Sequence, residues 1–256
     1  MSGKSAREER REQRLQEEQS ADSGEARRRR LLQFGSAAVF LAIVAVAVLI
    51  VVSQSDDGGG DASSVEGATE VREELSGIEQ DGLVLGDPTA KVTLIEFGDL
   101  QCPFCKAVSE DVIPAVIDSK VRTGLAELDF RNFTIISEES TPAGAAAIAA
   151  GEQGRGWDFV ELFYRNQGQE RSGYVTDEFL TSIAEGAGVP DIGKWDEARQ
   201  SKRVIGEVEA QTAEAGELGF SGTPSFAIEG PSIEGEESLG TPQSAGELEA
   251  AIDRAG

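Results

Sequence analysis

Histidine is absent from this chain of 256 residues, and cysteine occurs only twice, at Cys102 and Cys105. Without histidine the chain has no Ser–His or Cys–His catalytic pair and no histidine ligand for a metal. A structural zinc site takes four Cys or His ligands, and this chain offers two, so such a site would have to be shared with another molecule. The two cysteines are therefore the first candidates for chemistry.

Positive charge is scarce over most of the chain. Residues 1–30 hold nine of the 23 Lys and Arg residues and seven of the 47 Asp and Glu residues, so 14 basic and 40 acidic residues follow position 52. Binding to nucleic acid requires clusters of Lys and Arg that neutralise phosphates. The acidic body argues against a nucleic-acid partner, and we interpret its charge as a source of solubility.

Residues 31–52 contain no charged side chain and read LLQFGSAAVFLAIVAVAVLIVV. About 20 apolar residues suffice for a helix to span a bilayer. Arg27–Arg30 precede the run, and an excess of arginine on that side predicts a cytoplasmic N-terminus and an exported body. A cleaved signal peptide is the rival interpretation, although the leading segment is long for a signal. Both interpretations place the body outside the cytoplasm, where disulfides persist. We predict a single-pass protein of the cell membrane.

The segments on either side of this run are poor in apolar residues. Residues 1–30 have almost none and are predicted to form a charged cytoplasmic tail. Residues 53–77 begin with SQSDDGGGDASS and are predicted to be a flexible linker. The folded body is then expected over residues 78–256.

Strand and helix patterns alternate within this body. Strands are predicted at 82–86, 91–97, 125–136 and 223–228. The second of these, KVTLIEF, is an almost continuous apolar run, which is typical of a strand buried on both faces of a sheet. A helix is predicted to begin at Pro103 and to kink at Pro114.

A long helical segment, about 141–218, interrupts the strand pattern. Thr176 is its clearest predicted N-cap, because two acidic residues follow it. The large aromatic side chains recur at helical spacing and are predicted core residues: Trp157, Phe159, Phe163, Tyr164, Phe179 and Trp195. A hairpin region, PSIEGEESLG, and a closing helix that starts near Thr241 or Ser244 complete the chain. The order predicts an α/β sheet domain with a helical insertion.

The motif DLQCPFCK places two residues between the cysteines, at the junction of a predicted strand and a predicted helix. Cys102 would lie at the N-terminus of that helix, where free N–H groups and the helix dipole stabilise a thiolate. Cys105, one turn later, would be the more buried partner and close enough to bond to Cys102. The context predicts a redox pair. An inert structural disulfide is the alternative, but it would close a very small loop and so stabilise little.

Glu96 is a second candidate. Strand alternation places it on the same face as Val92 and Leu94. If both faces of the sheet are covered, burial would raise its pKa and suit it to exchange a proton with Cys105. The alternative is a glutamate at a frayed strand end that faces water, and the spacing alone does not decide between them.

Pro224 is the third candidate, because GFSGTPSFAI places it at the entry to a strand. Proline bonds in tight turns are sometimes cis. A loop here could lie beside the cysteines and present the backbone of Thr223 to an extended substrate. The alternative is an ordinary trans proline, which is far commoner.

The stretches VTLIEFGDLQCPFCK and GFSGTPSFAI together resemble the DsbA-like branch of the thioredoxin superfamily, the exported thiol–disulfide oxidoreductases of bacteria. The resemblance covers about residues 80–256 and implies a thioredoxin fold with a helical insertion. It implies that Cys102 attacks, that Cys105 resolves mixed disulfides, and that Glu96 is the buried acid.

The same resemblance identifies Thr223 and Pro224 as the cis-proline dipeptide that contacts substrate. Between the cysteines this chain has Pro103 and Phe104, where the best-known strongly oxidising members have Pro-His. We include this pair among the predicted substrate contacts. Phenylalanine donates neither a hydrogen bond nor a positive charge to a thiolate, so the resemblance does not fix the oxidising strength. The N-terminal anchor is similar to that of relatives tethered to the membrane in Gram-positive bacteria and actinobacteria.

The sequence thus predicts a membrane-anchored oxidoreductase that donates a Cys102–Cys105 disulfide to cysteine pairs in exported proteins. It needs no dissociable cofactor, because the disulfide carries the electrons. The resemblance implies a membrane partner that reoxidises it, a quinone-linked oxidase that is DsbB-like or vitamin-K-epoxide-reductase-like. Two alternatives stay open: a reductase or isomerase kept reduced by another membrane partner, and a non-catalytic thioredoxin-like module that binds proteins.

Overall fold

The computed structural model describes residues 65–242 and 244–256. The predicted cytoplasmic tail, the predicted transmembrane segment at 31–52 and residues 53–64 of the predicted linker lie outside these residues. Among the helices of the described part, none combines the length and the apolar character needed to cross a bilayer.

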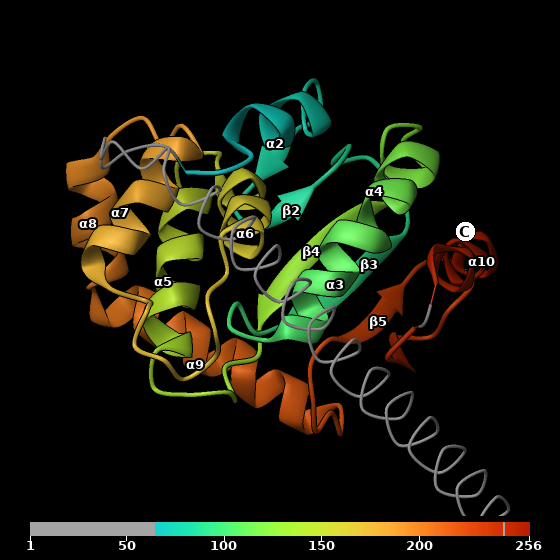
Figure 1. Ribbon diagram of the computed structural model, residues 1–256. Helices are drawn as coiled ribbons and strands as arrows, with labels where there is room; N and C mark the ends of the chain where they lie inside the picture. The colour runs from blue at the N-terminus through green and yellow to red at the C-terminus, as the bar shows by residue number, and fades with distance from the viewer. Residues whose placement is uncertain (1–64, 243) are drawn as a thin grey trace, which may run out of the picture. The chain divides into compact units, whose positions relative to one another are not determined.

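A six-stranded mixed sheet forms the centre of the described body, in the order β1-β2-β4-β3-β5-β6 (Figure 1). Its strands are β1 (Gln80–Asp81), β2 (Val84–Leu85), β3 (Thr93–Gly98), β4 (Glu127–Asn132), β5 (Ser225–Glu229) and β6 (Glu236–Gly240). β3 pairs with β4 in parallel and with β5 antiparallel, and the remaining pairs are antiparallel. β3, which leads into the cysteine motif, is therefore a central strand with a neighbour on each side.

The helices are α2 (Ala68–Glu74), α3 (Pro103–Asp111), α4 (Ile113–Val116), the π-helix η1 (Ile117–Val121), α5 (Ser140–Gly151), α6 (Gly156–Arg165), α7 (Asp177–Gly186), α8 (Ile192–Arg199), α9 (Lys202–Glu217) and α10 (Ala245–Ala255). α3 and α4 cross one face of the sheet, and α10 packs beside α4 and β5 (Figure 1). Five helices, α5 to α9, fill the segment that the helical periodicity predicted.

The alternation of β3 explains why its sequence is apolar at nearly every position. Leu94 belongs to the core on the α3 side, whereas Ile95 and Phe97 belong to a second cluster with Ala215 at the end of α9. Both faces are covered, as the KVTLIEF pattern predicted. The face that carries Leu94 also carries Glu96, so the fold places a carboxyl group in the main core.

Trp157 ties the helical insertion to the loop between β1 and β2, and Trp195 ties α8 to α5 within the insertion. The indole N–H of Trp157 donates to the carbonyl of Leu83 at 2.7 Å, and that of Trp195 donates to the carbonyl of Ala146 at 2.9 Å. Both rings are buried, as are the other predicted core aromatics except Phe179, which is half-buried. Thr176 caps α7 as predicted, accepting the N–H of Phe179 at 3.1 Å.

Three local expectations need correction. Residues 68–74, expected in the flexible linker, form α2, because Val71 and Leu75 bury their side chains in the core despite the polar composition around them. The strand expected at 125–136 covers only 127–132, and the one expected at 82–86 only 84–85.

Other local expectations agree with the structure. The helix that begins at Pro103 ends at Asp111 and restarts at Ile113, so Pro114 marks the expected break. β5 and β6 form the predicted hairpin. The final helix begins after Ser244, although the Ser244 side chain makes no capping hydrogen bond.

Candidate active site

Cys102 occupies the N-cap position of α3 and Pro103 follows it in the first turn. The backbone of Cys102 is extended, with φ −76° and ψ 120°, and its carbonyl accepts the N–H of Lys106 at 3.1 Å. This geometry leaves the sulfur beside the unpaired N–H groups at the positive end of the helix dipole. The structure thus places Cys102 where the sequence predicted it.

The pKa of Cys102 is lowered to about 6. The largest cause is a hydrogen bond from the Cys105 thiol, which stabilises the thiolate, with smaller contributions from Thr223 and from the N–H groups of Cys105 and Phe104. Burial acts in the opposite direction but does not outweigh them. Cys102 is therefore largely a thiolate at pH 7, the form that attacks disulfides.

Cys105 differs from Cys102 in the direction of its pKa shift. Both cysteines are buried, with 3% of Cys102 and none of Cys105 exposed, and Cys105 lies one turn further along α3. Burial is the main cause that raises the pKa of the Cys105 thiol, followed by its hydrogen bond with Cys102 and then by the charge on Cys102. Both cysteines are free thiols in this structure. A reactive thiolate thus lies next to an unreactive thiol, which is the asymmetry that a stepwise exchange requires.

Glu96 is buried, with 4% of its surface exposed, so it does not face water as one of the two interpretations supposed. In register it lies between Phe130 on β4 and Phe226 on β5. Its Oε1 atom has no hydrogen-bond partner in the described part of the chain. Burial, and then the charges of Glu161 and Cys102, raise the pKa of Glu96 to about 8. Near neutral pH this group therefore holds a proton.

The loop that leads into β5 lies against the reactive cysteine. The Thr223–Pro224 peptide bond is cis, and the thiol of Cys102 donates to the carbonyl of Thr223 at 3.4 Å. The hydroxyl of Thr241 donates to the carbonyl of Pro224 at 2.8 Å and so ties this loop to the segment after β6. The backbone of Thr223 is thus held within hydrogen-bonding distance of the sulfur.

A shallow groove of about 420 Å³ runs beside the cysteine pair. Phe104 is 72% exposed at its edge, and Pro103 is also exposed. Pro224 contributes to the wall from the other side, together with Thr223. Three of the four predicted contact residues, Phe104, Thr223 and Pro224, therefore line one groove, whereas Pro103 and the two cysteines do not line it.

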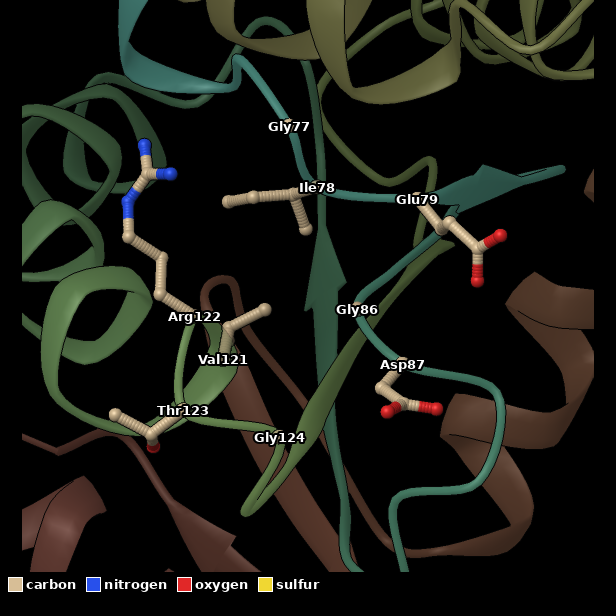
Figure 2. A pocket seen from close by; sticks show the side chains of 9 residues that line it. All are labelled: Gly77, Ile78, Glu79, Gly86, Asp87, Val121, Arg122, Thr123 and Gly124. Atoms are coloured by element: carbon tan, nitrogen blue, oxygen red, sulfur yellow. The ribbon is translucent and has the colours of Figure 1, made fainter.

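A second hollow, of about 360 Å³, lies away from the cysteines near the end of η1 (Figure 2). Arg122 runs along one side of it, opposite Glu79 and Asp87 (Figure 2). The guanidinium of Arg122 is already engaged, because it donates to the carbonyl of Ser76 at 3.0 Å and to the carboxyl group of Asp118 at 3.1 Å. Neither cysteine lines this hollow, so we assign it no part in the thiol chemistry.

Asp99, which the sequence analysis did not single out, fixes the turn before the cysteines. It is fully buried, and its Oδ1 atom accepts the N–H of Gln101 at 2.9 Å. Its Oδ2 atom accepts the N–H groups of Ile135 and Ile136, each at 2.9 Å. Asp99 thus ties the segment that follows β4 to the turn before the cysteines.

The helical insertion reaches the same turn through glutamine side chains. Gln167 donates to the carbonyls of Leu100 and Cys102, at 2.7 and 3.1 Å. Gln101 donates to the hydroxyl of Ser137 at 2.6 Å and accepts the N–H of Arg171 at 3.1 Å. No local pattern marks these residues, because their partners lie 36 to 70 positions away.

Replacing Asp99 by alanine should destabilise the protein by roughly 2–4 kcal/mol, because one buried and two partly buried N–H groups would lose their acceptor. Urea unfolding of the full chain, followed by the fluorescence of the buried tryptophans, measures this loss. Asp87→Ala is the matched control, since Asp87 also accepts an N–H group, that of Thr89 at 2.8 Å, but lies in water. Equal losses in the two variants would contradict the assignment.

Residues 79–254 match the family model described as Thioredoxin. Over 149 residues the chain is 30% identical to the probable disulfide bond formation protein D of Bacillus cereus, an alignment that covers 57% of this chain and 69% of that protein. The crystal structure of oxidised BdbD from Bacillus subtilis is similar, with a TM-score of 0.60, 20% identity, and coverage of 70% of this chain and 97% of that chain. A thioredoxin-like oxidoreductase from Silicibacter pomeroyi gives a TM-score of 0.54 at 28% identity, with coverage of 67% and 90%. The predicted thioredoxin fold is confirmed.

Proposed function

Because this chain belongs to the thioredoxin family, as a DsbA-like thiol–disulfide oxidoreductase, we propose that it oxidises cysteine pairs in exported proteins. Its oxidised form carries a Cys102–Cys105 disulfide and donates it to a substrate dithiol. The observation that carries the proposal is the contrast between the two thiols, a lowered pKa for Cys102 and a raised pKa for Cys105. The name of the Bacillus cereus relative supports disulfide formation as the direction.

In the first step a substrate thiolate attacks the sulfur of Cys102. A substrate–Cys102 disulfide forms, the Cys102–Cys105 bond breaks, and the electron pair leaves on Cys105. Cys105 is a poor leaving group as an anion, because burial raises its pKa. We assign the proton that neutralises it to Glu96, which is buried near the cysteines and protonated near neutral pH because its pKa is raised to about 8.

In the second step the second thiolate of the substrate attacks its own sulfur in the mixed disulfide. The substrate disulfide forms, and Cys102 leaves with the electron pair as a thiolate. A thiol of low pKa is the faster leaving group, and the pKa of Cys102 is lowered to about 6. Two electrons have then passed from the substrate to the chain, which is left as a dithiol.

The substrate chain lies, in this proposal, in the groove beside Cys102. Phe104 offers an exposed apolar surface at its edge, and the carbonyl of Thr223 is 3.4 Å from the sulfur. An extended peptide can pair with the backbone of Thr223 and Pro224 while its cysteine reaches Cys102. Pro103 and Phe104 stand in the place of a Pro-His pair, so the groove is apolar where a charged side chain would otherwise lie.

We place the body on the outer side of the cell membrane, anchored by residues 31–52 with residues 1–30 in the cytoplasm. The charge-free run and the arginines before it support this orientation. The reduced chain must lose two electrons before it can act again. A membrane oxidase that is DsbB-like or vitamin-K-epoxide-reductase-like, and that passes electrons to a quinone, is the partner we propose.

Mixing the oxidised full chain with a reduced, unfolded protein that contains two cysteines should transfer about one disulfide per chain. Mass spectrometry of alkylated samples counts the thiols on both proteins. If the oxidised chain transfers nothing while the reduced chain opens insulin disulfides, the reductase alternative holds. If neither form exchanges but the chain still retains the test protein, it is a binding module.

A further inference from the structure

One face of α3 is left open by the rest of the described chain. Four residues on this face are spaced by three or four positions, so their side chains form one row along the helix. They are Phe104, Ala107, Val108 and Asp111. Val108 is half-buried and the other three are exposed, whereas Cys105 on the opposite side of the helix is fully buried. The row is apolar except for its last member, which is a carboxylate.

The groove of about 420 Å³ beside the cysteine pair follows this row. The facing wall consists of the cis-proline loop and the segment after β6, through Thr223, Pro224, Thr241 and Pro242. None of these four side chains carries a charge. Among the residues that line the groove in the described part of the chain, Asp111 is therefore the only charged one. Its carboxylate lies at the end of α3 that is away from Cys102.

The charge of Asp111 is not compensated within residues 65–242 and 244–256, where its carboxylate has no ion pair and no hydrogen-bond donor. The neighbouring acid, Glu110, pairs with Lys106, whose ammonium group also donates to the carbonyl of Tyr164 at 2.6 Å on α6. An acid in the last turn of a helix faces the negative end of the helix dipole, and α3 has no basic residue in that turn. A ligand that supplies positive charge would remove this unfavourable arrangement.

The charge of the whole body indicates what kind of chain supplies it. Because 14 basic and 40 acidic residues follow position 52, a second copy of this protein would bring mainly negative charge to the groove. A segment of another protein that carries Lys or Arg is complementary to Asp111 and to the acidic surface around it. Its apolar side chains can pack on the part of the row that begins with Phe104.

The length of α3 determines where the positive charge must lie in such a segment. Asp111 follows Cys102 by nine positions, a distance of about 13 Å along a helix axis. An extended chain rises about 3.3 Å per residue, so about four residues span the same distance. Side chains four positions apart also point to the same side of an extended chain. A cysteine that faces Cys102 and a basic residue that faces Asp111 can therefore belong to one extended segment.

We propose that Asp111 is a specificity-determining residue, which selects exported substrate segments with Lys or Arg about four positions from the reactive cysteine. The contact is an exposed ion pair, so it changes the preference among substrates and is not required for the exchange itself. This inference rests on the proposed function, in that the groove holds the substrate chain. It does not depend on the direction of exchange, because reduced Cys102 attacks a substrate disulfide from the same position.

Single-cysteine peptides whose sulfur is joined to nitrothiobenzoate measure this preference. The thiolate of Cys102 in the reduced full chain attacks the peptide sulfur, a peptide–Cys102 disulfide forms, and coloured nitrothiobenzoate leaves with the electron pair. The absorbance gives the second-order rate constant. One peptide carries the variable residue four positions before the cysteine and another four positions after it. In one of these two placements Lys should react about two- to fivefold faster than Gln at low salt. The ratio should fall as salt is added, and it should be smaller with Lys five positions away.

Three variants assign the preference to its residue. Asp111→Asn keeps the shape of the side chain and should bring the ratio of Lys to Gln rate constants to about one. Asp111→Lys should invert the preference, so that a peptide with Glu at the same place reacts faster than one with Lys. Glu110→Gln is the matched control, because it removes the same charge from the next position of the helix but outside the groove, and it should preserve the ratio. Asp111 is exposed, so its variants should fold.

Equal rate constants for the Lys and Gln peptides in wild type would overturn the inference and leave the proposed function in place. An equal loss of preference in Glu110→Gln and Asp111→Asn would overturn it as well, because the general acidity of the body would then explain the effect. A preference that depends on Asp111, in a chain that fails to oxidise proteins with two cysteines, would uphold the inference and refute the proposed direction.

Discussion

Replacement of Cys102 by serine is expected to reduce disulfide transfer to the uncatalysed background, a loss on the order of 10³-fold or more. Cys102 is the thiol with the lowered pKa, and it alone of the two is the N-cap residue, with an extended backbone, beside the cis-proline loop. The chain has no third cysteine to take its place. The measurement is the rate at which the full chain oxidises a reduced test protein, compared with wild type.

Cys105→Ser is the matched variant, because it removes the other sulfur from the same helix. It should also fail to turn over, but for a different reason, since its single thiolate can still attack a substrate disulfide. The mixed disulfide then persists, because no neighbouring thiol releases it. Covalent complexes should accumulate on non-reducing gels for Cys105→Ser and not for Cys102→Ser. The opposite pattern would exchange the roles assigned to the two cysteines.

The scaffold around these cysteines was largely predictable from local patterns. The β-branched run before the motif predicted a strand buried on both faces of a sheet, Pro103 predicted the start of α3, and Pro114 predicted its break. In each case the signal lies within a few residues of the structure it determines. α2 was missed because it is only seven residues long, and two buried side chains, Val71 and Leu75, hold it in place instead of helix propensity.

The candidate site was predictable only where its residues carry a local signal. Strand alternation placed Glu96 on the face that proves to be buried, but it could not show that Phe130 and Phe226 enclose it. Asp99 and Gln167 were missed because their roles depend on contacts across the chain. Asp111 could have been noted from its spacing to Phe104, whereas the facing wall of the groove depends on where the cis-proline loop lies against α3.

The reduction potential should be less negative than about −270 mV, the value for thioredoxin, because the reduced form gains from the thiolate of Cys102. The lowered pKa of Cys102 stabilises the reduced protein. This stabilisation is complete above pH 9.0, the ordinary thiol pKa, and it is lost as the pH falls through about 6, the pKa of Cys102. At pH 7 the gain is about 1.4 kcal/mol, equivalent to about 30 mV, and contact with solvent makes this an upper value. A potential at or below −270 mV would favour the reductase alternative.

The pH dependence of that potential tests its cause. Below pH 6 both thiols take up protons on reduction, so the potential should fall by about 60 mV per pH unit. Above pH 6 Cys102 stays ionised, and a slope of about 30 mV per unit should follow. Equilibration of the full chain with glutathione buffers from pH 5 to 8 measures both slopes. The full chain is needed because a fragment that starts after Leu75 would lose the buried side chains of Val71 and Leu75.

Glu96 also affects how the potential depends on pH. The negative charge on reduced Cys102 raises the pKa of Glu96, so Glu96 takes up a proton when the chain is reduced. In wild type this uptake should steepen the slope again as the pH approaches 8, where Glu96 titrates. In Glu96→Gln the slope of about 30 mV per unit should continue towards pH 8 without that rise. The change of slope near pH 6 should remain, because it comes from the ionisation of Cys102. A uniform slope of about 60 mV per unit in both proteins would mean that Cys102 has an ordinary thiol pKa, and the proposed mechanism would lose its leaving group.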